Sequence, residues 1–477
     1  MKRGNKIIIW VALLLVAGAA GALARVVSQG GGLRQTVVGQ IVKGLISTPK
    51  EINLVQRALG MERPRTYLVL FLNNTELRPG GGFIGAYAIV KMDKTNPSII
   101  KVEGTEILDN RAPQNFPSEP PEPLKKYLKV ARWNFRDSNW SPDFRVASEK
   151  ALELYRKEKG VEAENIDAVV GFTPTVLEEV LKISGPIVLN GQEYTSENFT
   201  KKLEYEVEFG YAKQGLHFDD RKKALADLTH LMLERLRFDV FKHWSEYMGI
   251  LPRMLVEKQV AFYSKYPEEQ SIIEAKQWAG ALTSTGGDYL QWVDANLGAL
   301  KTDAVIDRSL AYSLKQSGES YTAEATMRFT HKGVFDNFTT RYRDYARIFV
   351  PLGSKLVGVT GAMETDRSTK PGKVDQGEEN GRQWFGAFIS IEPGKIGQLS
   401  FHYELPAQTV ENIKKNNYKL LVQKQMGTIA PQLTLRLDFG KPLVGAKPGE
   451  NSDKHGDQTY DYQTDLRVDR EFSVTTK

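Results

Sequence analysis

Apolar positions between residues 64 and 104 are grouped in a way that predicts a sheet. The runs "TYLVLFLNN" and "FIGAYAIVKMD" are dense enough to be buried strands, and "SIIKVEGTEILD" predicts a third. The first two runs are joined by a polar turn within "NNTELRPGGGFIGAY", residues 73–87. This turn carries one acid, one base and three consecutive glycines, which a simple hairpin does not require.

Helices alternate with strands from there to about residue 280. Ser141-Pro142-Asp143 predicts a helix start, with an N-cap hydroxyl, a proline in the first turn and an acid near the positive end of the helix dipole. "NIDAVVGF" predicts a strand, and "TVLEEVLKI" predicts a helix that ends at Gly185-Pro186. This order of elements is typical of an α/β or α+β domain.

The apolar period changes to two near residue 300. Seven short alternating segments, from "YTAEATMRFTH" to "LTLRLDF", are separated by turns and favour a β-sandwich. We therefore predict an α+β fold, with a mixed α/β domain at 63–300 and a β-sandwich domain at 301–477 that contains a polar loop at 445–461.

The N-terminus predicts a membrane anchor. Lys2, Arg3 and Lys6 precede an uncharged run at 7–24, which as a helix spans about 27 Å, close to the core of a bilayer. The positive flank places the N-terminus in the cytoplasm. We expect a single-pass anchor at 1–25, a juxtamembrane stalk at 26–62 and the bulk of the chain outside the cell membrane. The alternative is a cleaved signal peptide, because Ala22-Leu23-Ala24 fits a cleavage site.

Composition narrows the function classes. The net charge of +6 is mild for 477 residues and no long Lys/Arg block occurs, so we expect no nucleic-acid partner. The absence of cysteine excludes disulfides, thiolate catalysis and cysteine-bound metals. The six histidines are not paired at metal-ligand spacing. No Gly-x-Ser-x-Gly, Walker or dinucleotide-binding signature occurs, so spacing alone indicates no enzyme.

The first candidate site is the polar turn itself. Gly80, Gly81 and Gly82 would let the backbone approach a ligand, and their N–H groups would cradle an anion beside Glu76 and Arg78. The alternative is a tight turn between neighbouring strands, in which Glu76 and Arg78 are solvated or paired.

The second candidate site is the predicted helix start at residues 136–145. Helix N-termini bind anions readily. Capping accounts for Ser141 and Asp143, but it gives no role to Arg136, Asp137 or Asn139. Ligand binding and local salt bridges both remain open for these residues.

The third candidate is Arg221, in the segment "FDDRKK" that opens a long helical pattern. Acids are expected in the first turn of a helix, whereas an arginine is not. We expect Arg78 and Arg221 to face one cleft, together with Glu76 and the segment around Trp140.

Several segments resemble the domain-of-unknown-function family 4012, which comprises bacterial envelope proteins with an N-terminal membrane segment. They are "LVLFLNNTELRPGGGFIGAY", "DSNWSPDF", "NIDAVVGFTPTVLEEVLKISGPIVLNG", "DYLQWVDANLGALKTD" and "YARIFVPLG". The resemblance is collinear and runs from about residue 64 to 440. That family has no established activity to carry over.

A weaker similarity links the chain to LytR-CpsA-Psr domains, whose sheet is flanked by helices. The strand, polar turn and strand at 67–92 and the segment "FDDRKKALADLTHLMLERL" are similar to theirs. Those proteins transfer glycopolymers from a polyprenyl-pyrophosphate lipid to the cell wall, using arginines, an acid and Mg²⁺. The resemblance implies that Arg78 and Arg221 face the pyrophosphate and that Glu76 is an acidic candidate.

The chain departs from that pattern in two places. It has Pro79-Gly80-Gly81 where those proteins have Asp-Thr, and Lys222-Lys223 where their second motif continues Arg-Gln. A metal-binding aspartate is therefore missing or supplied elsewhere, with Asp137 and Asp143 as candidates. Mg²⁺ is the one cofactor that the resemblance suggests.

Two functions follow. In the first, an anchored envelope protein binds an anionic ligand of the pyrophosphate or glycan type in its α/β domain without catalysis. In the second, a LytR-CpsA-Psr-like transferase moves a glycopolymer to an envelope acceptor. The partners are the membrane and a lipid-linked glycan or envelope polymer. Catalytic residues and metal ligands stay unassigned, and so does the question of whether the protein is an enzyme.

The topology is testable. Protease added to intact spheroplasts should digest the bulk of the chain, because only the segment before residue 7 is expected in the cytoplasm. Full protection of the chain would contradict this orientation.

Overall fold

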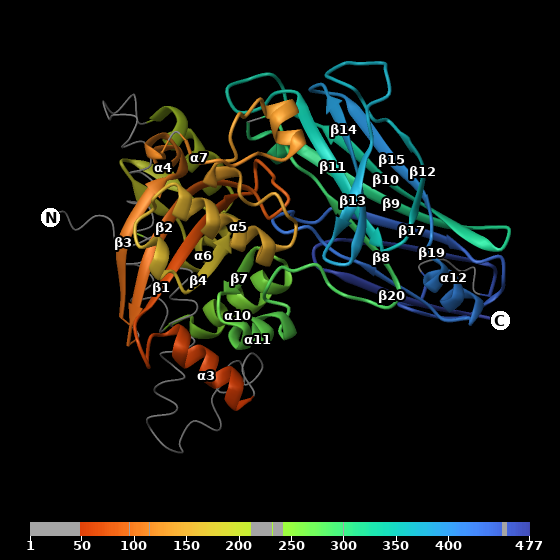
Figure 1. Cartoon of the computed structure of the whole chain (residues 1–477), viewed down its shortest axis with the longest axis horizontal. Coiled ribbons are helices and arrows are strands. Elements are labelled where there is room, and N and C mark those ends of the chain that lie inside the picture. Colours follow the sequence, from red (N-terminus) through yellow and green to blue (C-terminus); the bar gives the residue numbers. More distant parts are fainter. Residues whose placement is uncertain are drawn as a thin grey trace. The chain divides into compact units, whose positions relative to one another are not determined.

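The computed structural model describes residues 48–94, 96–113, 115–210, 231, 242–298, 300–450 and 456–477. The predicted membrane helix and Arg221 lie outside these ranges, as does most of the predicted stalk. Among the described residues, no helix is long and apolar enough to cross a membrane. The fold is mixed α+β with several sheets, which confirms the predicted class (Figure 1).

The chain forms two compact units, and each takes in separate stretches of sequence. Unit 1 consists of Met1–Asn73, Phe83–Ser118 and Arg132–Ala281. Unit 2 consists of Asn74–Gly82, Glu119–Ala131 and Leu282–Lys477. The polar turn between the first two strands therefore belongs to a different unit from the strands that it connects.

Unit 1 contains a five-stranded sheet in the order β3-β2-β1-β4-β7. β1 pairs antiparallel with β2 and parallel with β4, and β7 runs antiparallel to β4. Leucines, valines and aromatic residues make nearly all of β1 buried, as its apolar run predicts. The strands are β1 (Arg65–Asn73), β2 (Phe83–Asp93), β3 (Asn96–Gly104), β4 (Ala168–Phe172) and β7 (Val260–Ser264), with a separate small hairpin of β5 (Ile187–Leu189) and β6 (Gln192–Tyr194).

The helices of unit 1 present apolar stripes to this sheet. Val69 of β1, Val170 of β4, Val180 of α6 and Ile250 of α10 belong to one buried cluster. The helices are α3 (Pro49–Ala58), α4 (Thr105–Arg111), α5 (Phe144–Lys157), α6 (Thr175–Ser184), α7 (Phe199–Tyr205), α10 (Trp244–Val256) and α11 (Pro267–Ala275), with short turns η3 (Phe135–Asp137), η4 (Ala163–Asn165) and η5 (Glu206–Gly210).

One expected strand is only partly a strand. In "SIIKVEGTEILD" the strand stops at Gly104, and α4 follows. Thr105, Leu108 and Asp109 are its buried residues. Their spacing of three and four positions puts them on one helical face, so burial favours a helix here.

Unit 2 contains two sheets. One has six strands in the order β12-β15-β10-β9-β17-β19, and the other has seven in the order β13-β14-β11-β8-β16-β20-β18. The strands are β8 (Asp288–Val293), β9 (Ile306–Ser317), β10 (Ser320–His331), β11 (Tyr342–Pro351), β12 (Lys355–Thr360), β13 (Asp375–Glu379), β14 (Arg382–Ile391), β15 (Ile396–Glu404), β16 (Tyr418–Val422), β17 (Gln432–Asp438), β18 (Leu443–Lys447), β19 (Thr459–Asp465) and β20 (Arg470–Thr476). Three short helical segments complete the unit, η2 (Leu124–Leu128), η7 (Thr302–Val305) and α12 (Ala407–Lys414).

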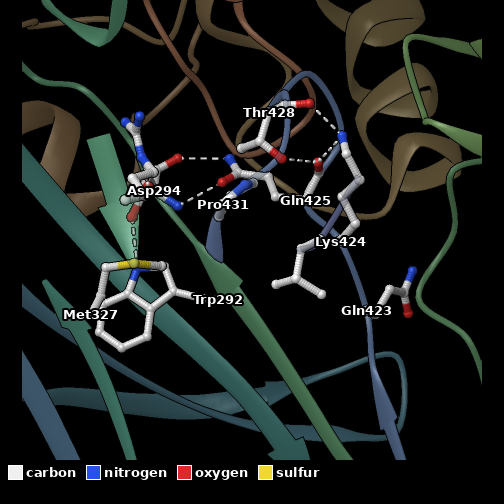
Figure 2. A pocket seen from close by; sticks show the side chains of 10 residues that line it. Trp292, Asp294, Met327, Gln423, Lys424, Gln425, Thr428 and Pro431 are labelled. Carbon is white, nitrogen blue, oxygen red and sulfur yellow. Dashed lines mark hydrogen bonds and ion pairs between the residues drawn. The ribbon is translucent and has the colours of Figure 1, made fainter. Parts of the chain in front are cut away.

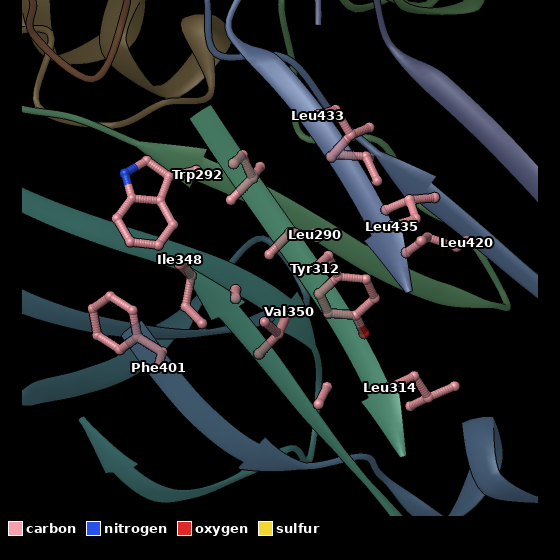
Figure 3. Close-up of a cluster of buried hydrophobic side chains, with 14 of the residues drawn as sticks. Leu290, Trp292, Tyr312, Leu314, Ile348, Val350, Phe401, Leu420, Leu433 and Leu435 are labelled. Atoms are coloured by element: carbon pink, nitrogen blue, oxygen red, sulfur yellow. The ribbon is translucent and has the colours of Figure 1, made fainter. Parts of the chain in front are cut away.

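Both sheets contribute side chains to one core. Leu290 of β8 and Ile348 of β11 come from the seven-stranded sheet, and Tyr312 of β9, Phe401 of β15 and Leu435 of β17 come from the six-stranded sheet (Figure 3). A single core shared by two sheets is the arrangement of a β-sandwich. The seven alternating segments of the sequence all lie in strands of this unit.

Independent folding of residues 301–477 stays a prediction. The position of β8 in its sheet allows this prediction to be tested with two fragments. This strand lies before residue 300, yet it pairs with both β11 and β16 in the middle of its sheet. We expect a fragment of residues 282–477 to melt cooperatively at a higher temperature than one of residues 302–477, because the second lacks a central strand. Equal melting temperatures, measured by circular dichroism, would contradict this.

Candidate functional site

Glu76 and Arg78 are buried in unit 2 and paired with each other. Arg78 Nη2 lies 3.1 Å from Glu76 Oε1, and the two residues are 2% and 4% exposed. Lys301 Nζ lies 3.0 Å from Glu76 Oε2, and Arg78 Nη1 donates a hydrogen bond of 2.6 Å to the carbonyl of Asn296. The structure thus shows the paired alternative for these two residues. A ligand role for them stays a prediction.

The backbone of the same turn is also held by unit 2. The Leu77 N–H donates to Asp303 Oδ2 at 2.8 Å, and the Leu77 carbonyl accepts from the Asn296 N–H at 3.0 Å. Gln425 Nε2 donates to the Arg78 carbonyl at 3.2 Å. The turn is therefore an internal element of unit 2, which explains why it carries a buried acid and a buried base.

The three glycines serve this packing. Gly80, Gly81 and Gly82 are all buried. Gly81 and Gly82 have positive backbone φ angles of 117° and 148°, which residues with a side chain rarely adopt. A Cβ on Gly427 would meet the Gly81 carbonyl oxygen at 1.9 Å, so two backbone segments pass in direct contact here.

A second buried charge cluster contacts the turn through Asp303, which accepts the hydrogen bond from the Leu77 N–H. Arg308 Nε pairs with Asp294 Oδ2 at 2.6 Å, and its Nη2 pairs with Asp303. Asp344 is also fully buried nearby, where burial and the charge of Asp294 raise its pKa well above the usual value. One arginine thus faces three acids in this cluster.

A cavity of about 10 Å³ lies beside this cluster (Figure 2). Gln425 reaches across it and bonds to Asp294 through both its amide oxygen and its nitrogen. The space suits about one water molecule and is far below the volume of a sugar or pyrophosphate site. Its walls are Trp292, Asp294, Arg308, Met327, Gln423, Lys424, Gln425, Thr428, Pro431 and Leu466.

The second predicted site, at the start of α5, lies in unit 1. The Asp143 carboxylate accepts hydrogen bonds from the N–H groups of Arg145 and Val146, at 3.0 and 3.3 Å. It therefore occupies the position that an external anion would take at this helix end. Asp137 and Asn139 are buried as well.

Arg136 differs from its neighbours because its side chain is 32% exposed. Its Nε lies 2.7 Å from Asp109 Oδ2, and Arg132 Nη2 donates to the Asp109 carbonyl at 3.2 Å. Two partly exposed guanidinium groups therefore meet at Asp109. Arg132 was not among the predicted site residues, because nothing in the local sequence shows that it meets Arg136 at a residue of α4.

Aromatic rings accompany these cations. The Arg132 guanidinium lies 4.6 Å from the centre of the Phe116 ring, and Lys150 Nζ lies 4.7 Å from that of Trp133. All of these side chains are at least partly exposed. We call the set the arginine–aromatic patch: Phe116, Arg132, Trp133, Arg136 and Lys150.

Asp109 and Glu158 form a buried carboxyl pair below the patch. Burial raises the pKa of Asp109 to about 9, and the negative charge of Glu158 adds to this effect. Burial also raises the pKa of Glu158, whose Oε1 accepts a hydrogen bond from the Phe135 N–H at 2.8 Å. An acid at the C-terminal cap of α5 is unfavourable for the helix dipole, and this was the one sequence signal that singles out Glu158.

The predicted site residues are divided between the units. Glu76, Arg78 and the three glycines belong to unit 2, whereas Arg136, Asp137, Asn139 and Asp143 belong to unit 1. Convergence of the two sets stays a prediction. Within the described part of the chain, no group of three or more acidic or histidine side chains is arranged to hold a metal, so ligands for Mg²⁺ remain unassigned.

Residues 62–207 match the model of the family described as "Protein of unknown function (DUF4012)". This match supports the stronger of the two resemblances found in the sequence. The similarity to LytR-CpsA-Psr domains stays a prediction.

Comparison with other proteins adds little about function. Among curated proteins, none matches the chain. A candidate nutrient-binding protein from Legionella pneumophila aligns at 9% identity and a TM-score of 0.25, over 40% of this chain and 71% of that one. An M1 zinc metallopeptidase from Deinococcus radiodurans aligns at 10% identity and a TM-score of 0.19, over 36% of this chain and 42% of that one. TM-scores this low do not indicate that either protein shares the fold of this chain.

Removing Arg78 should destabilise the protein. We expect Arg78→Ala to lower the free energy of unfolding by about 3–5 kcal/mol, because it removes one of the two cations paired with the buried Glu76 and leaves a space in the packed turn. Arg436→Ala is the matched control, since this arginine is exposed on β17 of the same unit and should change stability little. Denaturant unfolding measures both. Equal stability of the two variants would show that the pair is not structural.

The carboxyl pair should make stability depend on pH. The folded-state pKa of Asp109 is raised to about 9, so the folded protein keeps this proton while the unfolded chain loses it above about pH 4. The stability that the bound proton provides therefore falls as pH rises from about 4 to about 9. Asp109→Asn imitates the neutral acid, and its stability relative to wild type should rise with pH by up to about 1.4 kcal/mol per unit. Unfolding at pH 5, 7 and 9 tests this, with exposed Asp93→Asn as control. Parallel curves for wild type and Asp109→Asn would contradict it.

Proposed function

We propose that this protein is anchored in the cell membrane with its bulk outside the cytoplasm, and that it binds an anionic ligand of the pyrophosphate or glycan type through unit 1, without catalysis. The observation that carries the ligand proposal is the arginine–aromatic patch. Arg132 and Arg136 are both partly exposed there and converge on one residue, Asp109. The anchor rests on the charged and apolar pattern of residues 1–25.

The chemistry of the patch suits such a ligand. Guanidinium groups bind phosphate and carboxylate oxygens through paired hydrogen bonds. The partly exposed rings of Phe116 and Trp133 offer apolar surface against which a sugar ring can pack. Burial raises the pKa of Asp109 to about 9, so this acid is protonated at neutral pH and does not neutralise the charge of Arg136.

The transferase alternative draws less support from these residues. It requires Arg78 to contact a lipid pyrophosphate, and the Arg78 guanidinium is nearly inaccessible and paired with Glu76. Its remaining basis is the distant resemblance in the sequence. A binding protein needs only the partly exposed cations of the patch.

Ligand-induced stabilisation tests the proposal. We expect inorganic pyrophosphate or a phosphorylated glycan, at ten times its Kd, to stabilise the purified full chain by about 1.4 kcal/mol, read as a higher melting temperature. Arg132→Gln and Arg136→Gln should each remove most of this shift, because each removes one positively charged guanidinium group.

The matched control is Lys201→Gln, which removes an exposed cation from α7 of the same unit. This variant should keep the full ligand-induced shift. A shift that survives both arginine substitutions, or the absence of any shift with the wild-type chain, would overturn the proposed site.

A further inference from the structure

The six-stranded sheet of unit 2 ends at β12, whose outer edge is open. β12 pairs antiparallel with β15 on one side. Within the part of the chain that the structure describes, the backbone of residues 355–360 makes no hydrogen bond beyond this ladder. A row of N–H and C=O groups therefore remains available to another strand.

The sequence of β12 lacks most features that protect a sheet edge. "KLVGVT" has no proline and a single charge, and Val357 is 63% exposed. At the other end of this sheet, the Asp461 N–H of β19 donates to Glu450 and the Tyr460 hydroxyl bonds to the Pro448 carbonyl. In the seven-stranded sheet, the edge strand β13 carries three acids in five residues. Charges and covering segments discourage pairing at those edges, but not at β12.

The hydrophobic core is incompletely covered at the same edge. Leu356 and Val359 pack against the core but are only partly buried, as are Ala362 and Met363 just beyond the strand. An added strand would cover the first two side chains. Burial of apolar surface would thus accompany the new backbone hydrogen bonds.

The shape of β12 makes it complementary to itself. A bulge between Leu356 and Gly358 turns Leu356 and Val359 towards the core, opposite Tyr403 and Phe401 of β15. The other residues of the strand face away from the core. In an antiparallel pair of identical strands, Leu356 of each copy can lie opposite Val359 of the other, so that core-facing residues meet core-facing residues.

The same register also suits the remaining residues. Lys355 lies opposite Thr360, and Val357 lies opposite Gly358, so no lysine faces its own copy. All six residues of the strand take part. A foreign peptide would need to supply this pattern, whereas a second copy of the chain already has it.

We propose that β12 pairs antiparallel with β12 of a second copy of this chain, so that two six-stranded sheets join into one continuous sheet. The dimer removes both open edges at once. This inference is independent of the anionic ligand proposed for unit 1, since it involves unit 2 alone.

A cysteine cross-link tests the pairing in the full-length protein in its membrane. The chain has no cysteine, so Val357→Cys introduces a single thiol. In the proposed register the two Cα atoms at position 357 are about 6 Å apart, within reach of a disulfide. Mild oxidation should give a product of twice the monomer mass on a non-reducing gel.

Val444→Cys is the matched control. Val444 is 57% exposed and also lies at a bulge of an edge strand, β18, in the other sheet of the unit. It should not cross-link. Absence of the Val357→Cys dimer, equal cross-linking at position 444, or a cross-link to a protein of different mass would each overturn the proposal.

A second variant separates pairing from folding. Val357→Lys places an additional charge on the exposed edge and should shift the purified full chain from dimer to monomer in analytical ultracentrifugation. Its melting temperature at low concentration should stay near that of wild type, because the wild-type side chain is mostly exposed. A wild-type chain that is monomeric at every concentration, or a dimer that persists in Val357→Lys, would contradict the inference.

Discussion

The ion pair between Glu76 and Arg78 is the interaction on which the burial of the polar turn in unit 2 depends. Two opposite charges removed from water are costly unless each has a close partner and further hydrogen bonds. Here Lys301 and the Asn296 carbonyl provide them, and Asp303 fixes the backbone between the two charged residues. The charged turn, which the sequence predicts as a ligand site, is therefore held within unit 2 by its own ion pairs and hydrogen bonds.

The fold class and most strands were predictable because they depend on local pattern. Continuous apolar runs predicted β1 and β2, and alternation predicted the sheets of unit 2. Ser141-Pro142-Asp143 predicted a helix start at this place, but the N-cap is Asp143 instead of Ser141, and Pro142 lies before the first turn of α5. The helix α4 was missed because the apolar residues of "TEILD" fit a strand as well as a short helix. Only burial of Thr105, Leu108 and Asp109 on one face decides between them.

The candidate site was less predictable, since its residues meet through the fold. Glu76 and Lys301 are 225 positions apart, and no spacing rule connects them. The residue types alone could not show that Arg78 is inaccessible while Arg136 is partly exposed. The pairing of Asp109 with Glu158 similarly depends on how the fold brings α4 and the end of α5 together, and the raised pKa of both acids depends on this burial.

The central claim is that Glu76 and Arg78 stabilise unit 2 together. A double-mutant cycle of Glu76→Gln, Arg78→Met and the combined variant, measured by denaturant unfolding without ligand, tests it most directly. We expect the double variant to be less destabilised than the sum of the single ones, with a coupling of about 1–3 kcal/mol. Additive effects, with a coupling below about 0.5 kcal/mol, would contradict it.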